Sequence, residues 1–230
     1  MSVGAAIFVK TPGLSPVKTR LAATVGTKLA EAWYERCAHA VASVADQAGL
    51  DAVYWAVAEA AAASDARWSC KSVLVQPPGT LGVKMSAIHR ELVTRHGGGI
   101  LLGADAPQLD ANVLRRAAAW LDAESPRLVI GRSHDGGFWL FGANVKISPQ
   151  RWTDVSYSRS DTAEAFIRSM EGLGEWLELE WLTDLDTAVD LAQVVAELGI
   201  LEAPLESQRQ VLAELNLSIY AQTPPRRAMR

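Results

Sequence analysis

The chain has 230 residues and a formal net charge of −4, and 49% of its residues are apolar while 21% are charged. This composition is that of a globular protein with a sizeable core, and the small negative charge argues against general nucleic-acid binding. The two cysteines form no metal or redox motif, and no apolar run approaches the length of a membrane span. We therefore expect a cytoplasmic protein that has neither a nucleic acid nor a membrane as partner.

Apolar runs alternate with stretches of helical spacing along the chain. The first run, Val3–Val9, lacks a basic leader and is interpreted as a buried strand, not as a signal peptide. The pattern predicts further strands at 53–57, 72–76, 100–103, 127–131, 138–142 and 176–182, and helices at 27–47, 58–66, 81–96, 112–123, 161–170, 187–198 and 206–217.

The order of these elements indicates the fold class. Strands and helices alternate up to about residue 131, which favours a parallel sheet with helices on both faces. The closely spaced strands on either side of Gly136-Gly137 indicate one antiparallel pair, and residues 143–159 look irregular. With no internal repeat and no linker, residues 1–222 are predicted to form a single domain. The basic tail, 223–230, is expected to be a frayed terminus.

The connection after the first strand carries the strongest chemical signal. Two prolines, a glycine and a serine make it a shaped loop, and three cations lie on or beside it: Lys10, Lys18 and Arg20. Backbone donors and cations at a helix start suit a polyphosphate, with a bidentate fork from Arg20 and a point charge from Lys18. An ordinary loop with solvated lysines is the alternative that these residues alone leave open.

Acidic residues follow several predicted strands. Asp105 comes directly after the strand 100–103, where open α/β sheets bind ligands, and it could hold Mg²⁺ or simply cap a turn. Asp184 and Asp186 precede a helix, so they could supply a second metal ligand or an N-cap. Asp135, followed by two glycines, could allow close approach of a ligand or form a tight turn.

Four motifs occur in order along the chain: Val9-Lys-Thr-Pro-Gly-Leu-Ser-Pro-Val-Lys-Thr-Arg-Leu21, Gly103-Ala-Asp-Ala-Pro-Gln-Leu109, Asp135-Gly-Gly-Phe-Trp-Leu-Phe-Gly142 and Asp184-Leu-Asp-Thr-Ala-Val-Asp-Leu191. Together they resemble the bacterial glycosyltransferase-like family related to phospholactate guanylyltransferase, within the nucleotide-diphospho-sugar transferase superfamily. The resemblance implies a glycosyltransferase-A type fold, which is a Rossmann-like α/β/α sandwich with a mostly parallel mixed sheet.

The resemblance also assigns roles to particular residues. It implies that Lys18, Arg20 and Asp105 are catalytic, and that Asp105 and Asp186 bind Mg²⁺ or Mn²⁺. The implied acceptor or sugar pocket is bounded by Asp135, Gly136 and Gly137. The implied nucleotide site comprises Lys10, Pro12, Gly13, Lys18, Arg20 and Gly82. The chain departs from the family pattern at Ser15, Lys84 and the segment 132–134.

These expectations describe a metal-dependent transferase that moves a glycosyl or nucleotidyl group. Its partners would be a nucleoside triphosphate or nucleotide sugar and a small-molecule acceptor. A non-catalytic nucleotide-binding protein, regulatory or a pathway partner, is the alternative, because a shared fold does not fix function. A dehydrogenase is disfavoured, since the first loop lacks the Gly-x-Gly-x-x-Gly fingerprint. The sequence leaves a homo-oligomeric state open.

Overall fold

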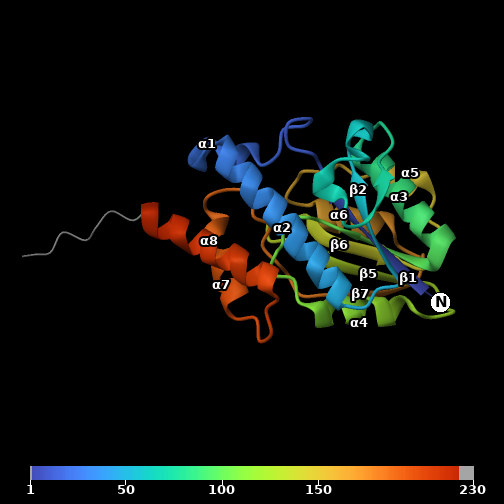
Figure 1. Cartoon of the computed structure of the whole chain (residues 1–230). Helices are drawn as coiled ribbons and strands as arrows, with labels where there is room; N and C mark the ends of the chain where they lie inside the picture. Colours follow the sequence, from blue (N-terminus) through green and yellow to red (C-terminus); the bar gives the residue numbers. More distant parts are fainter. Residues whose placement is uncertain (1, 223–230) are drawn as a thin grey trace, which may run out of the picture.

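The computed structural model describes residues 2–222, and the predicted tail, 223–230, lies outside this range. The described residues form one seven-stranded sheet in the order β3-β2-β1-β4-β6-β5-β7 (Figure 1). All neighbouring strands pair in parallel except β6, which is antiparallel to both β4 and β5. The strands are β1 (Ser2–Val9), β2 (Ala52–Val57), β3 (Ser72–Val75), β4 (Gly97–Leu102), β5 (Arg127–Arg132), β6 (Phe138–Ala143) and β7 (Glu175–Glu178).

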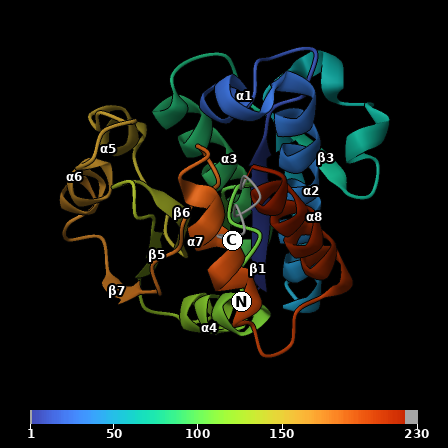
Figure 2. The ribbon, with the colours of Figure 1, turned by 90° about the vertical axis from the view of Figure 1, so that its left-hand side faces the viewer.

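The helices cover the sheet on both faces, which gives the expected three-layer α/β/α sandwich. Figure 2 shows α5 and α6 beside β5 and β6, with α2 and α8 packed together at the other end of the molecule. The α-helices are α1 (Thr19–Val25), α2 (Thr27–Gln47), α3 (Leu81–His96), α4 (Ala111–Leu121), α5 (Pro149–Thr153), α6 (Thr162–Ser169), α7 (Asp190–Gly199) and α8 (Glu206–Gln222). Two short 3₁₀ helices, η1 (Ala60–Ala62) and η2 (Ala66–Trp68), precede β3.

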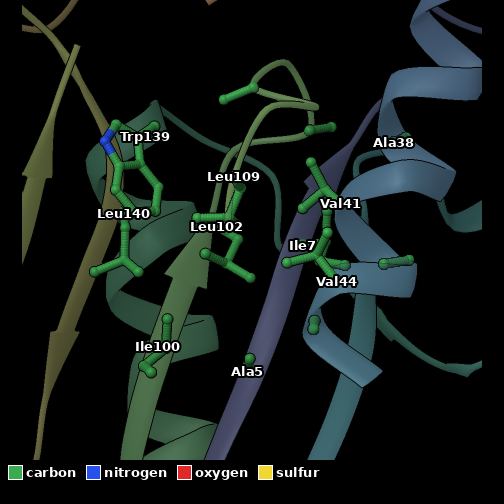
Figure 3. Packing of buried hydrophobic residues seen from close by; sticks show 14 of the residues in the cluster. Ala5, Ile7, Ala38, Val41, Val44, Ile100, Leu102, Leu109, Trp139 and Leu140 are labelled. Atoms are coloured by element: carbon green, nitrogen blue, oxygen red, sulfur yellow. The ribbon is translucent and has the colours of Figure 1, made fainter. Parts of the chain in front are cut away.

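The two core layers follow from the alternation of side chains along each strand. Ile7 of β1 and Leu102 of β4 pack against Val41 of α2 on one face (Figure 3). The neighbouring residues, Ala6 and Leu101, point to the other face, where α3, α5 and α6 cover them. Every central strand is therefore apolar on both sides, as a parallel sheet between two helical layers requires.

The structure differs from the expected elements in several places. In place of the helix expected at 58–66 it has the two short 3₁₀ helices η1 and η2. A short helix, α1, follows the first loop and precedes Gly26, whose φ of +87° separates it from α2. The three glycines at 97–99 end α3 as expected, but they also begin β4. A Cβ on Gly99 would stand 2.8 Å from the Cβ of Leu92, so the glycine lets α3 approach the sheet closely. The segment 143–159, expected to be irregular, contains α5.

The topology brings several loops to one edge of the sheet. Strands β1 to β5 all end at this edge, and β6 begins there after the turn 133–137. The segment after β7 continues to the same edge, where Ser133 and Leu182 form an isolated parallel bridge. The strand order reverses at β1, because β2 and β3 lie on one side of it and β4 lies on the other. In an open α/β sheet, a ligand site is expected at the edge where strands end beside such a reversal.

Among residues 2–222, no helix is both long and apolar enough to cross a lipid bilayer.

Candidate active site

Lys18 lies where the first loop enters α1, in a left-handed conformation with φ 46°. The loop is fixed at its start by Thr11, whose backbone N–H donates to Glu59 at 3.0 Å and whose hydroxyl accepts from the indole of Trp68 at 3.0 Å. The carbonyl of Thr11 also accepts from the backbone of Leu14 and Ser15. These anchors hold the loop in one shape and so set the direction in which Lys18 leaves the backbone.

The Lys18 ammonium bridges two carboxylates that come from distant parts of the chain. Its Nζ lies 2.7 Å from Asp105 Oδ2 and 2.7 Å from Asp186 Oδ1, and its side chain is only 5% exposed. Burial opposes the charged form, but Asp105 and Asp186 outweigh burial and raise the pKa of Lys18 above its usual value. Arg20, which is 68% exposed, pairs with Asp186 Oδ2 at 2.5 Å. Burial alone would raise the pKa of Asp186, but Lys18 and Arg20 lower it overall.

Backbone hydrogen bonds place Asp186 beside Asp105. The N–H of Leu185 donates to the carbonyl of Asp105 at 3.0 Å, which joins the loop after β4 to the segment before α7. Asp190 then accepts from the backbone N–H groups of Asp186 and Thr187, at 3.1 and 2.7 Å. The N-cap interpretation is wrong, because the N-cap of α7 is Val189 and it has no side-chain hydrogen bond; Asp186 faces the cleft instead.

Asp184 lies on the same segment and is partly buried. Its burial and the nearby charge of Asp105 raise its pKa to about 7, although Ser133 and Lys18 oppose the shift. The sequence pointed to Asp184 and Asp186 as a pair, and the structure separates their surroundings. Asp186 is neutralised by two cations, whereas Asp184 faces the part of the cleft that is lined by the 135–137 turn.

The cleft at this edge has two chambers. The first, of about 500 Å³, is called the basic chamber; its polar lining includes Lys10, Lys18, Arg20, Lys84, Gln76 and Asp105. The second, of about 640 Å³, is called the acidic chamber; its lining includes Asp135, Asp184, Gly137, Phe138, Tyr157 and Arg159. Both chambers share Phe8, Arg20, Leu81, Ser158 and Asp186, so the Arg20–Asp186 pair stands where they meet.

The turn between β5 and β6 bounds the acidic chamber. Gly136 has φ +90°, and a Cβ on it would stand 2.0 Å from the carbonyl oxygen of Ser160. The Gly137 N–H donates to Asp135 Oδ1 at 2.8 Å, as in a tight Asp-Gly turn. The tight-turn interpretation of this motif is confirmed, and a role in ligand binding for Asp135 and Gly137, which line the chamber, stays a prediction.

The nucleotide-binding residues implied by the resemblance are not all brought together. Lys10, Lys18 and Arg20 line the basic chamber, whereas Pro12 and Gly13 are not among the residues that line either chamber. Gly82 also does not line them: it is buried in α3, and a Cβ there would stand 2.4 Å from the carbonyl oxygen of Trp152. In this structure Gly82 makes room for α5, which is a packing role that corrects the expected one.

Several lining residues were not expected from the sequence. Tyr157, Ser158 and Arg159 come from the segment between α5 and α6, which had no recognisable pattern. Among residues 2–222, the non-glycine residues with positive φ are Lys18 and Ser158, and both line the basic chamber. Left-handed non-glycine residues tend to cluster at functional sites, but no sequence signal could have marked Ser158 in advance.

The residues present fit a divalent cation bound through one or two carboxylates. Asp105 Oδ1 is buried and has no hydrogen-bond partner in the described part of the chain, so it is an orphaned acceptor beside Asp186. No cluster of three or more metal-ligating side chains occurs among residues 2–222. A sparse protein contribution of this kind suits Mg²⁺, which keeps several of its waters.

Comparison with known proteins places this architecture in a family. The family profile described as "Uncharacterized protein conserved in bacteria (DUF2064)" matches residues 35–159. The chain belongs to the DUF2064 family. The matched segment of this DUF2064 protein includes Asp105 and the 135–137 turn. A search of curated proteins finds no match.

Solved structures similar to this DUF2064 protein share its fold at low sequence identity. A Desulfovibrio desulfuricans G20 protein, provisionally assigned as a nucleotide-diphospho-sugar transferase, is 22% identical with a TM-score of 0.81, over 96% of this chain and 98% of that one. CMP:2-keto-3-deoxy-manno-octonic acid synthetase complexed with CTP is 13% identical with a TM-score of 0.54, over 86% and 99%. The 4-diphosphocytidyl-2C-methyl-D-erythritol synthase of Anaerococcus prevotii DSM 20548 is 9% identical with a TM-score of 0.53, over 86% and 96%. These similarities confirm the expected fold class.

Proposed function

We propose that this protein is a metal-dependent transferase that binds a nucleotide-activated donor in the basic chamber and a second group in the acidic chamber. The observation that carries the proposal is the two-chamber cleft, in which chambers of different charge meet at Arg20 and Asp186. A transfer reaction needs two groups held side by side, and their alignment alone supplies a large part of the rate enhancement.

The basic chamber has the chemistry that phosphates require. Lys18 and Arg20 are directed to one point, and Lys84 and Lys10 add positive charge to the same lining. When bound at Asp105 and Asp186, Mg²⁺ or Mn²⁺ would neutralise charge on the phosphate oxygens and on the leaving diphosphate. The named activities of the similar structures, a CTP-complexed synthetase among them, agree with a nucleotide in this position.

The proposal covers both glycosyl and nucleotidyl transfer. The relation to phospholactate guanylyltransferase, taken from the sequence motifs, belongs to the nucleotidyl form of the proposal. A direct in-line transfer needs no protein nucleophile, so the positioning groups Lys18, Arg20 and Asp105 would suffice. A cytoplasmic location agrees with the expected use of nucleotide donors and stays a prediction.

A ligand screen tests the proposal. We expect nucleoside triphosphates or nucleotide sugars to raise the unfolding temperature, and to raise it more with Mg²⁺ than with a chelator. A ligand at about 100 times its Kd should add about 2.7 kcal/mol of stability. The bound nucleotide is then offered with candidate acceptors, and release of diphosphate or pyrophosphate is measured. Absence of nucleotide binding would refute the proposal, whereas Mg²⁺-independent binding without turnover would favour the non-catalytic alternative.

A further inference from the structure

The two chambers differ in the charge that they offer to a ligand. In the acidic chamber, each of the two cations is already paired: Arg20 with Asp186 at 2.5 Å, and Arg159 with Asp161 at 3.1 Å. The other two carboxylates of the lining, Asp135 and Asp184, have no ion pair within the described residues. A ligand entering this chamber therefore meets the unpaired carboxylate of Asp135, together with the unpaired acidic side chain of Asp184.

The exposed carboxylate of Asp135 sets a requirement on that ligand, because a carboxylate accepts hydrogen bonds but cannot donate them. Asp135 is exposed and uses Oδ1 to accept from the Gly137 backbone, which orients its carboxylate and leaves Oδ2 available. Hydroxyl groups can satisfy such acceptors. A carboxylate or phosphate in the same position would place like charges together and weaken binding.

Aromatic side chains form the apolar part of the same lining. Phe138 and Tyr157 are both partly exposed there, and the Tyr157 hydroxyl donates to the Trp152 carbonyl at 2.7 Å, which holds the ring in place. With its hydroxyl engaged outside the chamber, Tyr157 contributes mainly ring surface. A flat group with apolar C–H faces and hydroxyl edges would match both the rings and the carboxylates.

We infer that the acidic chamber takes an uncharged, hydroxyl-rich group, such as the glycosyl part of a nucleotide sugar, and discriminates against an anionic one. The inference rests on the proposed function, since the nucleotide in the basic chamber delivers the group. It deepens that function by making the transferred or accepting group a neutral polyol and not a phosphorylated or carboxylated acid.

The test compares two nucleotide sugars that differ only by a hydroxymethyl group or a carboxylate. UDP-glucose and UDP-glucuronate form one such pair, and GDP-mannose and GDP-mannuronate form the pair for a guanine-binding protein. Calorimetric titration with Mg²⁺ should show at least about tenfold tighter binding of the neutral sugar. Because the nucleotide is common to both ligands, its own affinity cancels in the ratio.

Substitutions test whether the ratio of the two affinities depends on the acidic chamber. Asp135→Asn should reduce the preference for the neutral sugar severalfold, and Asp184→Asn should reduce it to a smaller extent. Asp154→Asn, an exposed site outside both chambers, should leave it unchanged. Asp135 is itself exposed, so its variant should fold even if the Asp184 variant does not.

The outcomes separate this inference from the proposed function. Equal or tighter binding of the anionic sugar, or a ratio that neither variant alters, would overturn the inference while the nucleoside diphosphate alone still binds. Failure of the nucleoside diphosphate itself to bind would instead refute the proposed function and the inference with it.

Discussion

Lys18 and its two carboxylates form a compact charge arrangement at the mouth of the cleft. A single ammonium, 2.7 Å from Asp105 and from Asp186, holds together residues that lie far apart in the sequence. Removing one member of a partly buried ion cluster costs stability because the remaining charge loses its partner. The same contact leaves Asp105 Oδ1 without a hydrogen bond, which suits a second cation.

Asp105→Asn should abolish Mg²⁺-dependent nucleotide binding and turnover while the protein stays folded. Asparagine keeps the shape of the side chain but removes the charge that would hold the cation. Because Asp105 is paired with Lys18, we expect a modest loss of stability, about 1 kcal/mol, and not a gain from relieved repulsion. Calorimetric titration with and without Mg²⁺ measures the effect, with Asp154→Asn as control. Equal Mg²⁺ dependence in wild type and Asp105→Asn would exclude the metal-ligand role.

Lys18→Met should destabilise the metal-free protein by about 2 kcal/mol, since Asp105 and Asp186 would face each other without the ammonium between them. Mg²⁺ should then raise the unfolding temperature of the variant more than that of wild type, because the cation can replace the missing charge. Lys71→Met removes a lysine paired with a single aspartate, Asp46, and should show no such gain. An identical Mg²⁺ shift in wild type and Lys18→Met would contradict this.

At the scale of the elements, the turn between β5 and β6 is locked to the segment that precedes α6. The N–H of Ala163 donates to the Gly136 carbonyl at 2.9 Å, and Gly136 has room for no side chain against Ser160. The turn therefore carries a folding constraint in addition to its place on the cleft. An alanine at Gly136 should therefore impair folding as well as any ligand binding.

Gly136→Ala and Gly26→Ala form a matched pair, with φ of +90° and +87°. Gly26, with ψ 150°, has no heavy atom within 4 Å of an added Cβ, so its substitution tests the positive-φ backbone alone and should cost about 2 kcal/mol. Gly136→Ala adds a clash with the Ser160 backbone and should cost about 3 kcal/mol. Urea unfolding of the two variants measures the difference. Equal costs would show that the turn relaxes without strain.

At the scale of the whole molecule, the sheet separates two cores, and the α3 side contains a buried histidine. His89 packs between the rings of Phe141 and Trp152, with centroid distances of 5.8 and 5.3 Å. Burial lowers its pKa to about 4, which outweighs the opposing effect of the Ala143 backbone. The native state therefore keeps His89 neutral at a pH where the unfolded chain takes up a proton.

The stability of the protein should therefore decrease as the pH falls from about 6.5 to about 4. Over this range the unfolded state binds a proton that native His89 does not, so the lowered pKa amounts to about 3 kcal/mol. His89→Leu should remove this component and flatten the acid side of the stability profile. The exposed His134 serves as control, since His134→Gln should leave the profile unchanged. An unaltered acid profile in His89→Leu would contradict the prediction.

The sequence alone determined most of the architecture, because the apolar periodicity that marks each strand or long helix is contained within that element. The limits of α3 and the antiparallel pair around Gly136 were both predicted correctly from it. It missed α1 and α5, which are too short for their periodicity to stand out. Asp105 was recognisable because it directly follows an apolar strand, and carboxyl ends of parallel strands share one edge.

The tertiary structure alone decided which charges meet. Asp105 and Asp186 both had two interpretations in the sequence, and only the packing of the segment before α7 against the loop after β4 brings them to one ammonium. The same is true of Gly82, which fills a packing gap against Trp152, and of Ser158, which lines both chambers. Contacts between residues that lie this far apart in the sequence depend on how whole elements pack, and no local sequence pattern determines which of them meet.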